Sequence, residues 1–573
     1  MDKILSGYLN KFIEDFELDD NEKKLTDNFE FFSSYVLISN QLINPNLEIS
    51  DLENVSIKKN KGIDSIGIII NNKLATSLKE LEDLLSNNST ANIDLIFIQA
   101  KTSESFEDAE LGNFCDTIKD FLLEEPKYEM TQEAKDYHEM LLFIYEKLAY
   151  IKSFNSKAFY SCSGKWNEEN SINKTLIIKR EEIKKEHNIF KNGDFKIIPC
   201  DKSALIKLYD KITTPLKTEF KLNNMVTLSN LPVEIDEAHI GLIEFVDFKK
   251  IIIDPDTFRI RSLFYDNVRD DLGIDNPVNK KISKTLTDKK FSLFPLLNNG
   301  VTILAEKNTG TSNKFILDNF QIVNGCQTSN VIFEHINDEG INQLMIPIKL
   351  IVTTNQDIKD DIIIATNQQT EIKEEQLIAL SEFQKELEKF YQSGTDDIYY
   401  ERRTNQYKNT NIKKKNIIDL REQIKTFVAI FMEEPHMVSG YFGKIYNQNK
   451  DKLFVEEHKH LPYYFAGLIQ YKFKDLLNRK LIDRKYNKLR YHIFMLYRKI
   501  HEPEGFNFEI LKKKKQSYTE SLITSLTESR MLDNFNKVFE IIDSSGIDID
   551  NSKEIYKKST TNALLEKFNE IYK

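Results

Sequence analysis

Two apolar runs near the N-terminus, residues 62–70 and 93–101, have the length and the β-branched and aromatic content of buried strands. Each run keeps polar side chains at one end: Asp64 lies near the start of the first run, and Gln99 and Lys101 close the second. Gln99 and Lys101 are two positions apart, so they point to the same face of a strand. Paired strands would place a carboxylate, an amide oxygen and an ammonium group together, a set that can hold Mg²⁺ and activate water. The alternative is a carboxylate in a turn and a lysine that reaches solvent.

Apolar residues at helical spacing predict helices around these strands and throughout the last third of the chain. In the first part we expect helices over residues 4–16, 28–43, 111–123 and 131–154, and one more within the leucine-containing segment 73–91. Strand-like segments are expected over residues 158–162, 175–178 and 195–198, followed by a helix over 202–212. Beyond residue 415 we expect helices over residues 417–433, 461–477, 489–501, 519–542 and 560–572.

Short polar signatures stand between apolar strands from residue 250 to residue 375. The four clearest occupy residues 263–269, 297–303, 321–328 and 365–372. An Asn-Gly pair favours a turn, because both residues tolerate positive φ, and this interpretation suits Asn299-Gly300. In the third signature, Asn324, Gln327 and Thr328 precede a predicted helix over residues 329–336. The free N–H groups at a helix start suit an anion such as phosphate.

Two such elements converging on one pocket would surround a ligand with uncharged donors and acceptors. The candidate ligand-binding residues are Arg269, Asn324, Gln327, Thr328, Asn367 and Gln369, with Arg269 supplying positive charge. This set suits a nucleotide or a backbone phosphate. The alternative is that these side chains bond one another and cap helices, a common use of Asn and Thr.

Charge and cysteine content narrow the class of protein. The formal charge of −11 argues against indiscriminate coating of nucleic acid, so any such contact falls to local basic patches. The patch that follows Tyr399 offers Arg402, Arg403 and Tyr407 as candidate nucleic-acid contacts; a solvated face and buried ion pairs are the alternatives. The four cysteines show no paired spacing, which argues against a disulfide framework and structural zinc.

Hydropathy gives an expectation about location. No apolar run approaches the ~20 residues of a membrane span, and the N-terminus lacks the apolar core of a signal peptide. We therefore expect a cytoplasmic protein without a membrane partner.

Asp64 followed by Gln99-Ala100-Lys101 resembles the PD-(D/E)XK nuclease superfamily, in the Gln variant found in Mrr-like restriction nucleases. The resemblance implies that Asp64 binds Mg²⁺ or Mn²⁺, that Gln99 contributes its carbonyl oxygen, and that Lys101 orients or polarises the attacking water. In these nucleases a Glu from the preceding helix often completes the metal shell, and Glu30 is the candidate here. Gln departs from the common acid, and it supplies no charge to the metal.

The four polar signatures, in their order, resemble the AIPR family of abortive-infection phage-resistance proteins. The residues that carry the likeness are Asn267-Val268-Arg269, Asn298-Asn299-Gly300-Val301-Thr302, Asn324-Gly325-Cys326-Gln327-Thr328, Thr366-Asn367-Gln368-Gln369-Thr370 and Tyr400-Glu401-Arg402-Arg403. The likeness covers roughly residues 155–440. Members of the family commonly carry an N-terminal Mrr-like region, so the two resemblances imply one architecture.

The expected fold is a multidomain mixed α/β (α+β) protein, since 573 residues exceed what one core fills. We expect a restriction-endonuclease-like α/β domain over residues 1–145, an α/β connecting domain over 146–245, an AIPR core over 246–385 and a helical domain over 386–573. The expected function is Mg²⁺-dependent hydrolysis of DNA or RNA in antiphage defence. The alternative is a non-catalytic sensor that binds nucleic acid or nucleotide through a degenerate site. A phage-derived trigger and a homo-oligomer are the further partners considered.

Overall fold

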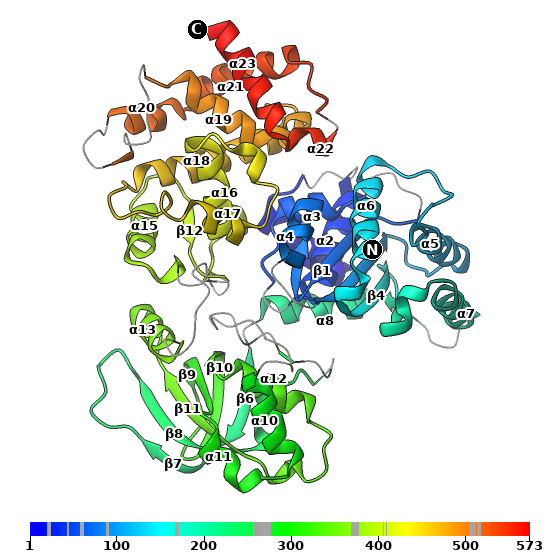
Figure 1. The fold of residues 1–573 in the computed structure, drawn as a ribbon, viewed down its shortest axis with the longest axis vertical. Coiled ribbons are helices and arrows are strands. Elements are labelled where there is room, and N and C mark those ends of the chain that lie inside the picture. The colour runs from blue at the N-terminus through cyan, green and yellow to red at the C-terminus, as the bar shows by residue number, and fades with distance from the viewer. Residues whose placement is uncertain are drawn as a thin grey trace. The chain divides into compact units, whose positions relative to one another are not determined.

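The computed structural model describes the chain except residues 20–23, 43–44, 58–61, 87–90, 167–170, 215, 256–257, 259, 262, 264–276, 368–377, 405, 408–409, 504–510, 513–516, 550 and 573. The chain forms two compact units. The first combines Met1–Ile212 with Glu382–Lys573, and the second is Thr213–Ser381, so both ends of the chain belong to one unit (Figure 1). Among the described residues, no helix has the length and apolar character needed to cross a membrane.

The N-terminal part of the first unit is built on a five-stranded mixed sheet in the order β2-β1-β3-β4-β5. Its strands are β1 (Ser65–Ile70), β2 (Lys73–Ala75), β3 (Ala91–Lys101), β4 (Ile151–Cys162) and β5 (Phe195–Cys200). β1 pairs antiparallel with β2 and β3, whereas β3, β4 and β5 run parallel. The predicted pairing of the two apolar runs is confirmed. The boundary predicted at residue 145 falls inside this sheet, between β3 and β4.

Alternate residues of β3 face two separate cores, as the period of a strand requires. Leu95 and Phe97 pack on one face with α4 (Leu78–Ser86), α5 (Asp108–Phe121), α6 (Gln132–Glu146) and α7 (Ser171–Glu186). Ile96 and Ile98 pack on the other face with α1 (Lys3–Phe16), α2 (Leu25–Ser39), α3 (Ile49–Val55) and α8 (Lys202–Thr213). Helices therefore cover both faces of the sheet, which explains why its strands are near-continuous apolar runs.

Two predictions for this region are wrong. Residues 175–178, expected as a strand, lie within α7, where Ile177 and Ile178 are exposed. The charged residues around them make a surface helix, and this context overrides the β-branched composition. The helix expected over residues 131–154 ends at Glu146, because Ile151 already begins β4.

The C-terminal part of the first unit is mostly helical, with a two-stranded parallel pair, β12 (Tyr399–Glu401) and β13 (Ile417–Asp419). Its helices are α15 (Glu382–Gln392), α16 (Leu420–Phe431), α17 (Phe442–Asn449), α18 (Leu461–Asn478), α19 (Arg490–Ile500), α20 (Ser517–Ser525), α21 (Glu528–Ser544), α22 (Ser552–Ile555) and α23 (Lys558–Tyr572). Two predicted helices differ from the structure: residues 417–419 form β13, and the helix expected over 519–542 is divided between α20 and α21.

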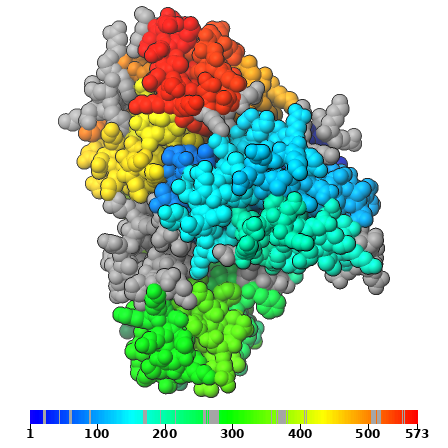
Figure 2. Space-filling model, turned by 45° about the vertical axis from the view of Figure 1, so that its right-hand side comes forward, coloured from blue at the N-terminus to red at the C-terminus, as the bar shows by residue number. Residues whose placement is uncertain are grey.

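Ion pairs to two buried carboxylates, Asp51 and Asp83, join the N-terminal and C-terminal parts of this unit. The Arg421 guanidinium donates to both oxygens of Asp51, at 3.1 and 2.9 Å. Lys444 lies 2.7 Å from Asp83. Figure 2 shows the blue-to-cyan N-terminal residues directly beside the yellow-to-red C-terminal helices. The N-terminal sheet with its covering helices, which we call the N-terminal sandwich, and the C-terminal helices thus form one folded unit.

The second unit is a six-stranded sheet in the order β6-β10-β9-β11-β8-β7. The strands are β6 (Lys217–Lys221), β7 (Asn223–Thr227), β8 (Glu237–Glu244), β9 (Val301–Asn308), β10 (Lys314–Asn324) and β11 (Met345–Val352). β9 and β11 are parallel and the other pairs are antiparallel. β6 and β7 are separated by Leu222 alone and yet occupy opposite edges, so the sheet curls into a half-barrel.

Helices cover both faces of the curled sheet. The larger core packs α9 (Phe245–Ile252), α10 (Pro277–Thr287), α11 (Phe294–Leu297) and α12 (Cys326–Glu334) against it. A smaller core holds α13 (Gln356–Asn367) against the opposite face. α12 begins at Cys326, earlier than the helix start expected at residue 329.

Candidate functional site

The beginning of β1 and the end of β3 bring Asp64, Gln99 and Lys101 together. Asp64 donates its backbone N–H to the Ile98 carbonyl at 2.9 Å, which extends the β1–β3 pairing by one residue. Its carboxylate Oδ2 accepts the Ala100 N–H at 2.7 Å. Strand alternation places Asp64 on the face of Ile66, and Gln99 and Lys101 on the face of Phe97, which is the same face of the sheet. The structure thus places these three residues on one face of the sheet, at neighbouring strand ends.

The Gln99 side chain is buried, with 5% of its surface exposed, and its Oε1 has no hydrogen-bond partner. A buried carbonyl oxygen without a partner costs free energy, so most such atoms in proteins are satisfied. The unpartnered Gln99 Oε1, on the same face as the buried Asp64 carboxylate, is therefore suited to bind a ligand.

Glu110, in the first turn of α5, is the acidic residue that sequence reasoning missed. Its Oε1 lies 4.0 Å from the Lys101 ammonium, and its Oε2 accepts a hydrogen bond from the Tyr160 hydroxyl at 3.0 Å. Tyr160 is the β4 partner of Gln99. The sequence held one indication of Glu110: it is an acid in the first turn of the helix that follows the second apolar run. That helix, α5, packs on the face of the sheet to which Gln99 and Lys101 point.

The electrostatics of Asp64 reflect this neighbourhood. Burial raises the pKa of Asp64, the Ala100 N–H and the Lys101 charge lower it, and Glu110 raises it again. The balance leaves the carboxyl pKa above its ordinary value. A cation bound beside Asp64 would favour the ionised form of this carboxyl group.

Glu30 lies elsewhere. It belongs to α2, whose Phe29 and Phe32 pack on the opposite face of the sheet, in the core of Ile96 and Ile98. Glu30 lines a separate cavity of about 850 Å³ together with residues such as Lys474. The sheet therefore separates Glu30 from Asp64, and Glu110 is the carboxylate that accompanies Asp64.

The donors at the strand ends fit a hard divalent cation. Asp64 and Glu110 supply carboxylate oxygens and Gln99 supplies an amide oxygen, the ligand types that Mg²⁺ prefers. Among the described residues, no three His, Cys, Asp or Glu side chains are grouped as a metal site, so the set depends on the glutamine oxygen. The unpartnered Gln99 Oε1 is the observation that makes the set suitable.

Arg402, Arg403 and Tyr407 are buried. Arg402 Nε donates to Glu388 Oε2 at 2.6 Å, and the Tyr407 hydroxyl donates to the Tyr400 carbonyl at 3.3 Å. Buried side chains do not offer a face for phosphates or bases. For Arg402 the structure shows the buried ion pair that the sequence left open as an alternative.

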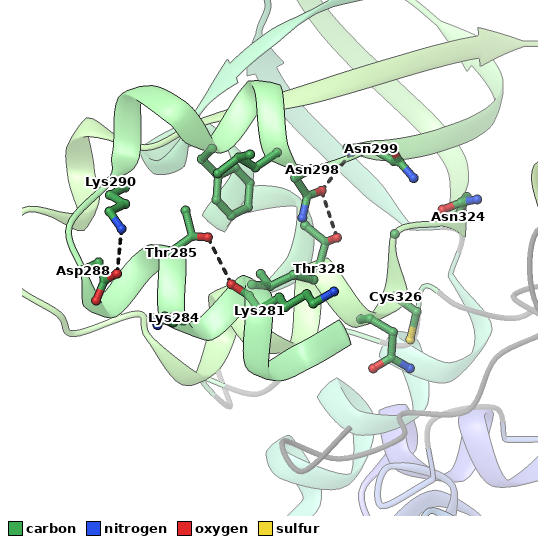
Figure 3. A pocket seen from close by; sticks show the side chains of 16 residues that line it. Lys281, Lys284, Thr285, Asp288, Lys290, Asn298, Asn299, Asn324, Cys326 and Thr328 are labelled. Atoms are coloured by element: carbon green, nitrogen blue, oxygen red, sulfur yellow. Dashed lines mark hydrogen bonds and ion pairs between the residues drawn. The ribbon is translucent and has the colours of Figure 1, made fainter. Parts of the chain in front are cut away.

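In the second unit, two of the four polar signatures line one cavity of about 500 Å³ (Figure 3). Asn298, Asn299 and Gly300 come from the loop before β9, and residues 324–328 run from the end of β10 to the start of α12. Gly300 has φ +77°, and an added Cβ would lie 2.3 Å from the Pro347 carbonyl oxygen, so the predicted turn at Asn299-Gly300 requires glycine.

Several predicted ligand-binding side chains bond to the protein itself. Gln327 Oε1 accepts from Asn279 at 2.6 Å, Thr328 donates to Asn298 Oδ1 at 3.2 Å, and Asn324 donates to the Thr366 carbonyl. These bonds support the alternative in which the polar side chains hold the fold. Arg269, Gln369 and the side chain of Asn367 lie outside the described residues.

The family model described as AIPR protein matches residues 264–565, more than half of the chain. The chain belongs to the AIPR family. This family is linked to abortive-infection phage resistance. No curated protein and no solved structure matches the chain.

The AIPR match begins in the second unit and continues through most of the C-terminal helices of the first. It starts later and extends further than the span of residues 155–440 that the motifs suggested. The second-unit cavity lies inside the AIPR match, whereas Asp64, Gln99, Lys101 and Glu110 lie outside it. The strand-end site therefore rests on its own geometry.

Proposed function

We propose that this AIPR protein is a metal-dependent nuclease of phage defence, and that Asp64, Gln99, Lys101 and Glu110 form its catalytic site. The proposal is carried by one observation: the buried Gln99 Oε1 has no hydrogen-bond partner and lies on the same face as Asp64 and Lys101. The likeness of Asp64 and Gln99-Ala100-Lys101 to PD-(D/E)XK nucleases supports it. The mixed sheet with helices on both faces agrees with the restriction-endonuclease-like domain expected from that likeness.

Each side chain has a distinct role in this proposal. Asp64 and Gln99 hold Mg²⁺ or Mn²⁺ through one carboxylate and one amide oxygen, and Glu110 adds a second carboxylate. When bound, the cation lowers the pKa of a water ligand and neutralises charge on the phosphodiester. The Lys101 ammonium, one-third exposed, orients the attacking water and stabilises negative charge that develops on the phosphate.

Two neighbours position these groups. The Ala100 N–H fixes one oxygen of Asp64, and the Tyr160 hydroxyl fixes one oxygen of Glu110. A carboxylate held by a hydrogen bond keeps its orientation when the substrate arrives, which lowers the cost of assembling the site. The proposed substrate is DNA or RNA.

The test is cleavage of plasmid DNA and total RNA by the purified full-length protein in Mg²⁺, in Mn²⁺ and in EDTA. We expect cleavage in the metal ions and none in EDTA. Asp64→Asn and Lys101→Met should each reduce the rate by at least 100-fold, and Glu110→Gln by at least tenfold, while all three variants remain folded.

The matched control is Asp94→Asn, because Asp94 is a carboxylate on β3, the strand of Gln99 and Lys101, near its other end. This variant should cleave at the wild-type rate. Metal-dependent cleavage that persists in Asp64→Asn would place the activity elsewhere. Phage protection that persists without any cleavage would favour the non-catalytic sensor.

A further inference from the structure

We infer that the cavity in the second unit binds a free nucleotide, with the phosphates at Lys281 and the start of α12 and the base against Ile282 and Leu297. The cavity volume of about 500 Å³ lies within the roughly 300–1,000 Å³ of small-molecule sites. The inference is independent of the strand-end site, because all lining residues belong to the second unit.

One side of the cavity is cationic. Lys281, Lys284 and Lys290 line it against a single acid, Asp288, which pairs with Lys290 at 2.9 Å. Among the described residues, Lys281 and Lys284 have no carboxylate partner within ion-pair distance. Three lysines against one acid give this side of the cavity a net positive charge, which in a protein of net charge −11 indicates a local site for an anion.

The Lys281 side chain is directed to a second source of positive potential. Figure 3 shows it extending from α10 toward Thr328, in the first turn of α12. The residue before that helix is Gly325, at φ +104°, which has no side chain to cap the first N–H groups. Backbone N–H groups and an ammonium facing one space suit phosphate oxygens.

The rest of the lining suits a nucleoside. Ile282, Phe294 and Leu297 provide an apolar wall, and Leu297 is 66% exposed although it borders the cavity. Asn299 adds an amide group to the lining for the polar edge of a base or a ribose hydroxyl, whereas the Asn324 amide nitrogen already donates to the Thr366 carbonyl. A cavity lined by lysines, apolar side chains and an amide group offers contacts to each of the three parts of a nucleotide.

Internal hydrogen bonds fix this shape in advance. Asn298 Oδ1 accepts from the Gly300 N–H at 2.9 Å and from Thr328 at 3.2 Å, so one side chain ties the loop before β9 to the start of α12. Gln327 is held by Asn279 of α10. A preformed site loses less conformational freedom on binding.

The test is isothermal titration calorimetry of the full-length protein in EDTA with ATP, GTP, CTP and UTP as separate probes. We expect at least one of them to bind with a Kd below about 1 mM, and its nucleoside and pyrophosphate alone to bind at least tenfold more weakly. Lys281→Gln should weaken binding by about tenfold or more, as the loss of a charge-assisted hydrogen bond predicts. Leu297→Asp should weaken it similarly.

The chain offers matched controls. Lys289 is exposed and pairs with Glu339, and Leu296 is 80% exposed beside Leu297; neither lines the cavity. Lys289→Gln and Leu296→Asp should bind within twofold of wild type. The inference is overturned if none of the four probes binds at 1 mM, or if the cavity variants behave as these controls do. It is also overturned if pyrophosphate binds as tightly as the nucleotide, or if a 5′-phosphorylated oligonucleotide binds more than tenfold tighter than every mononucleotide.

Discussion

Replacing Gln99 with methionine should stabilise the first unit while abolishing metal-dependent cleavage. The Gln99 Oε1 is buried without a hydrogen-bond partner, and a buried group in that state costs about 1–3 kcal/mol. Methionine has a similar length and volume, so the substitution leaves no large cavity. The expected net gain in the free energy of unfolding is therefore about 1–2 kcal/mol, with complete loss of a metal ligand.

The matched comparison is Gln423→Met. Gln423 is fully buried in α16, but its Oε1 accepts from the Tyr391 hydroxyl at 2.5 Å and its Nε2 donates to the Tyr463 carbonyl at 3.0 Å. The same substitution there should destabilise by about 1–3 kcal/mol, because it removes two buried hydrogen bonds and leaves the Tyr391 hydroxyl and the Tyr463 carbonyl bonded only to each other. Identical chemistry thus predicts opposite signs at two buried glutamines.

Denaturant unfolding in EDTA, repeated in 10 mM Mg²⁺, measures both effects. Wild type should gain stability with Mg²⁺, by about 1.4 kcal/mol for each tenfold excess of Mg²⁺ over Kd, whereas Gln99→Met should gain none. If Gln99→Met destabilises the protein as much as Gln423→Met does, the Gln99 amide serves the fold and the metal assignment fails.

Three further predictions concern the buried charges of the first unit. Arg402→Leu leaves the Glu388 carboxylate in a poorly solvated position without its 2.6 Å ion-pair partner. This variant should lower the free energy of unfolding by about 3–5 kcal/mol, measured as a lower unfolding midpoint. Wild-type stability with weaker nucleic-acid binding would instead support the phosphate-contact interpretation. Arg421→Leu removes the two hydrogen bonds that Arg421 donates to Asp51 and leaves the one from the Glu48 N–H, so it should cost a similar amount. The double variant with Asp51→Asn should recover part of this cost, and strict additivity in the cycle would mean that the pair does not interact. Burial raises the pKa of Glu401 from an ordinary 4.5 to about 8, so the folded state binds a proton that the unfolded state has lost. The free energy of unfolding should therefore fall as pH rises from about 5 to above 8. Glu401→Gln should flatten that slope in thermal scans, and an unchanged slope would contradict the burial argument.

The strand-end site was predictable in part because its signal is local. Asp64, Gln99 and Lys101 interrupt apolar runs where a buried strand has no packing reason to keep them, and the period of two places Gln99 and Lys101 on one face. Asp64 shares that face because of the register in which β1 pairs with β3. Glu110 was not predictable in the same way, because its approach to Lys101 depends on how α5 packs on the sheet. The prediction of Glu30 as a metal ligand did not match the structure for the same reason. The apolar face of a helix can be predicted from sequence, but the side of the sheet that the helix covers cannot.

Charge patterns were less informative than apolar ones. A basic sequence with tyrosines looks the same whether its arginines bind phosphates or form buried ion pairs with carboxylates. Arg402 forms a buried ion pair. The segment 175–178 illustrates a related limit, since its local β propensity is outweighed by the surface helix around it. The glycine-dependent turn at residue 300 was predictable because its requirement is a backbone conformation.

The interrupted first unit sets the order in which the protein can be completed during synthesis. Asp51 leaves the ribosome early, and its partner Arg421 emerges only after the whole second unit has been translated. Until then the Asp51 carboxylate stays in water, and the hydrogen bonds from Arg421 form only when the C-terminal helices pack against it. The intervening unit adds little to the entropy of closure, because that cost grows only with the logarithm of the loop length. A chain released prematurely therefore keeps the sequence of the strand-end site but lacks the helices that neutralise the charges around its scaffold.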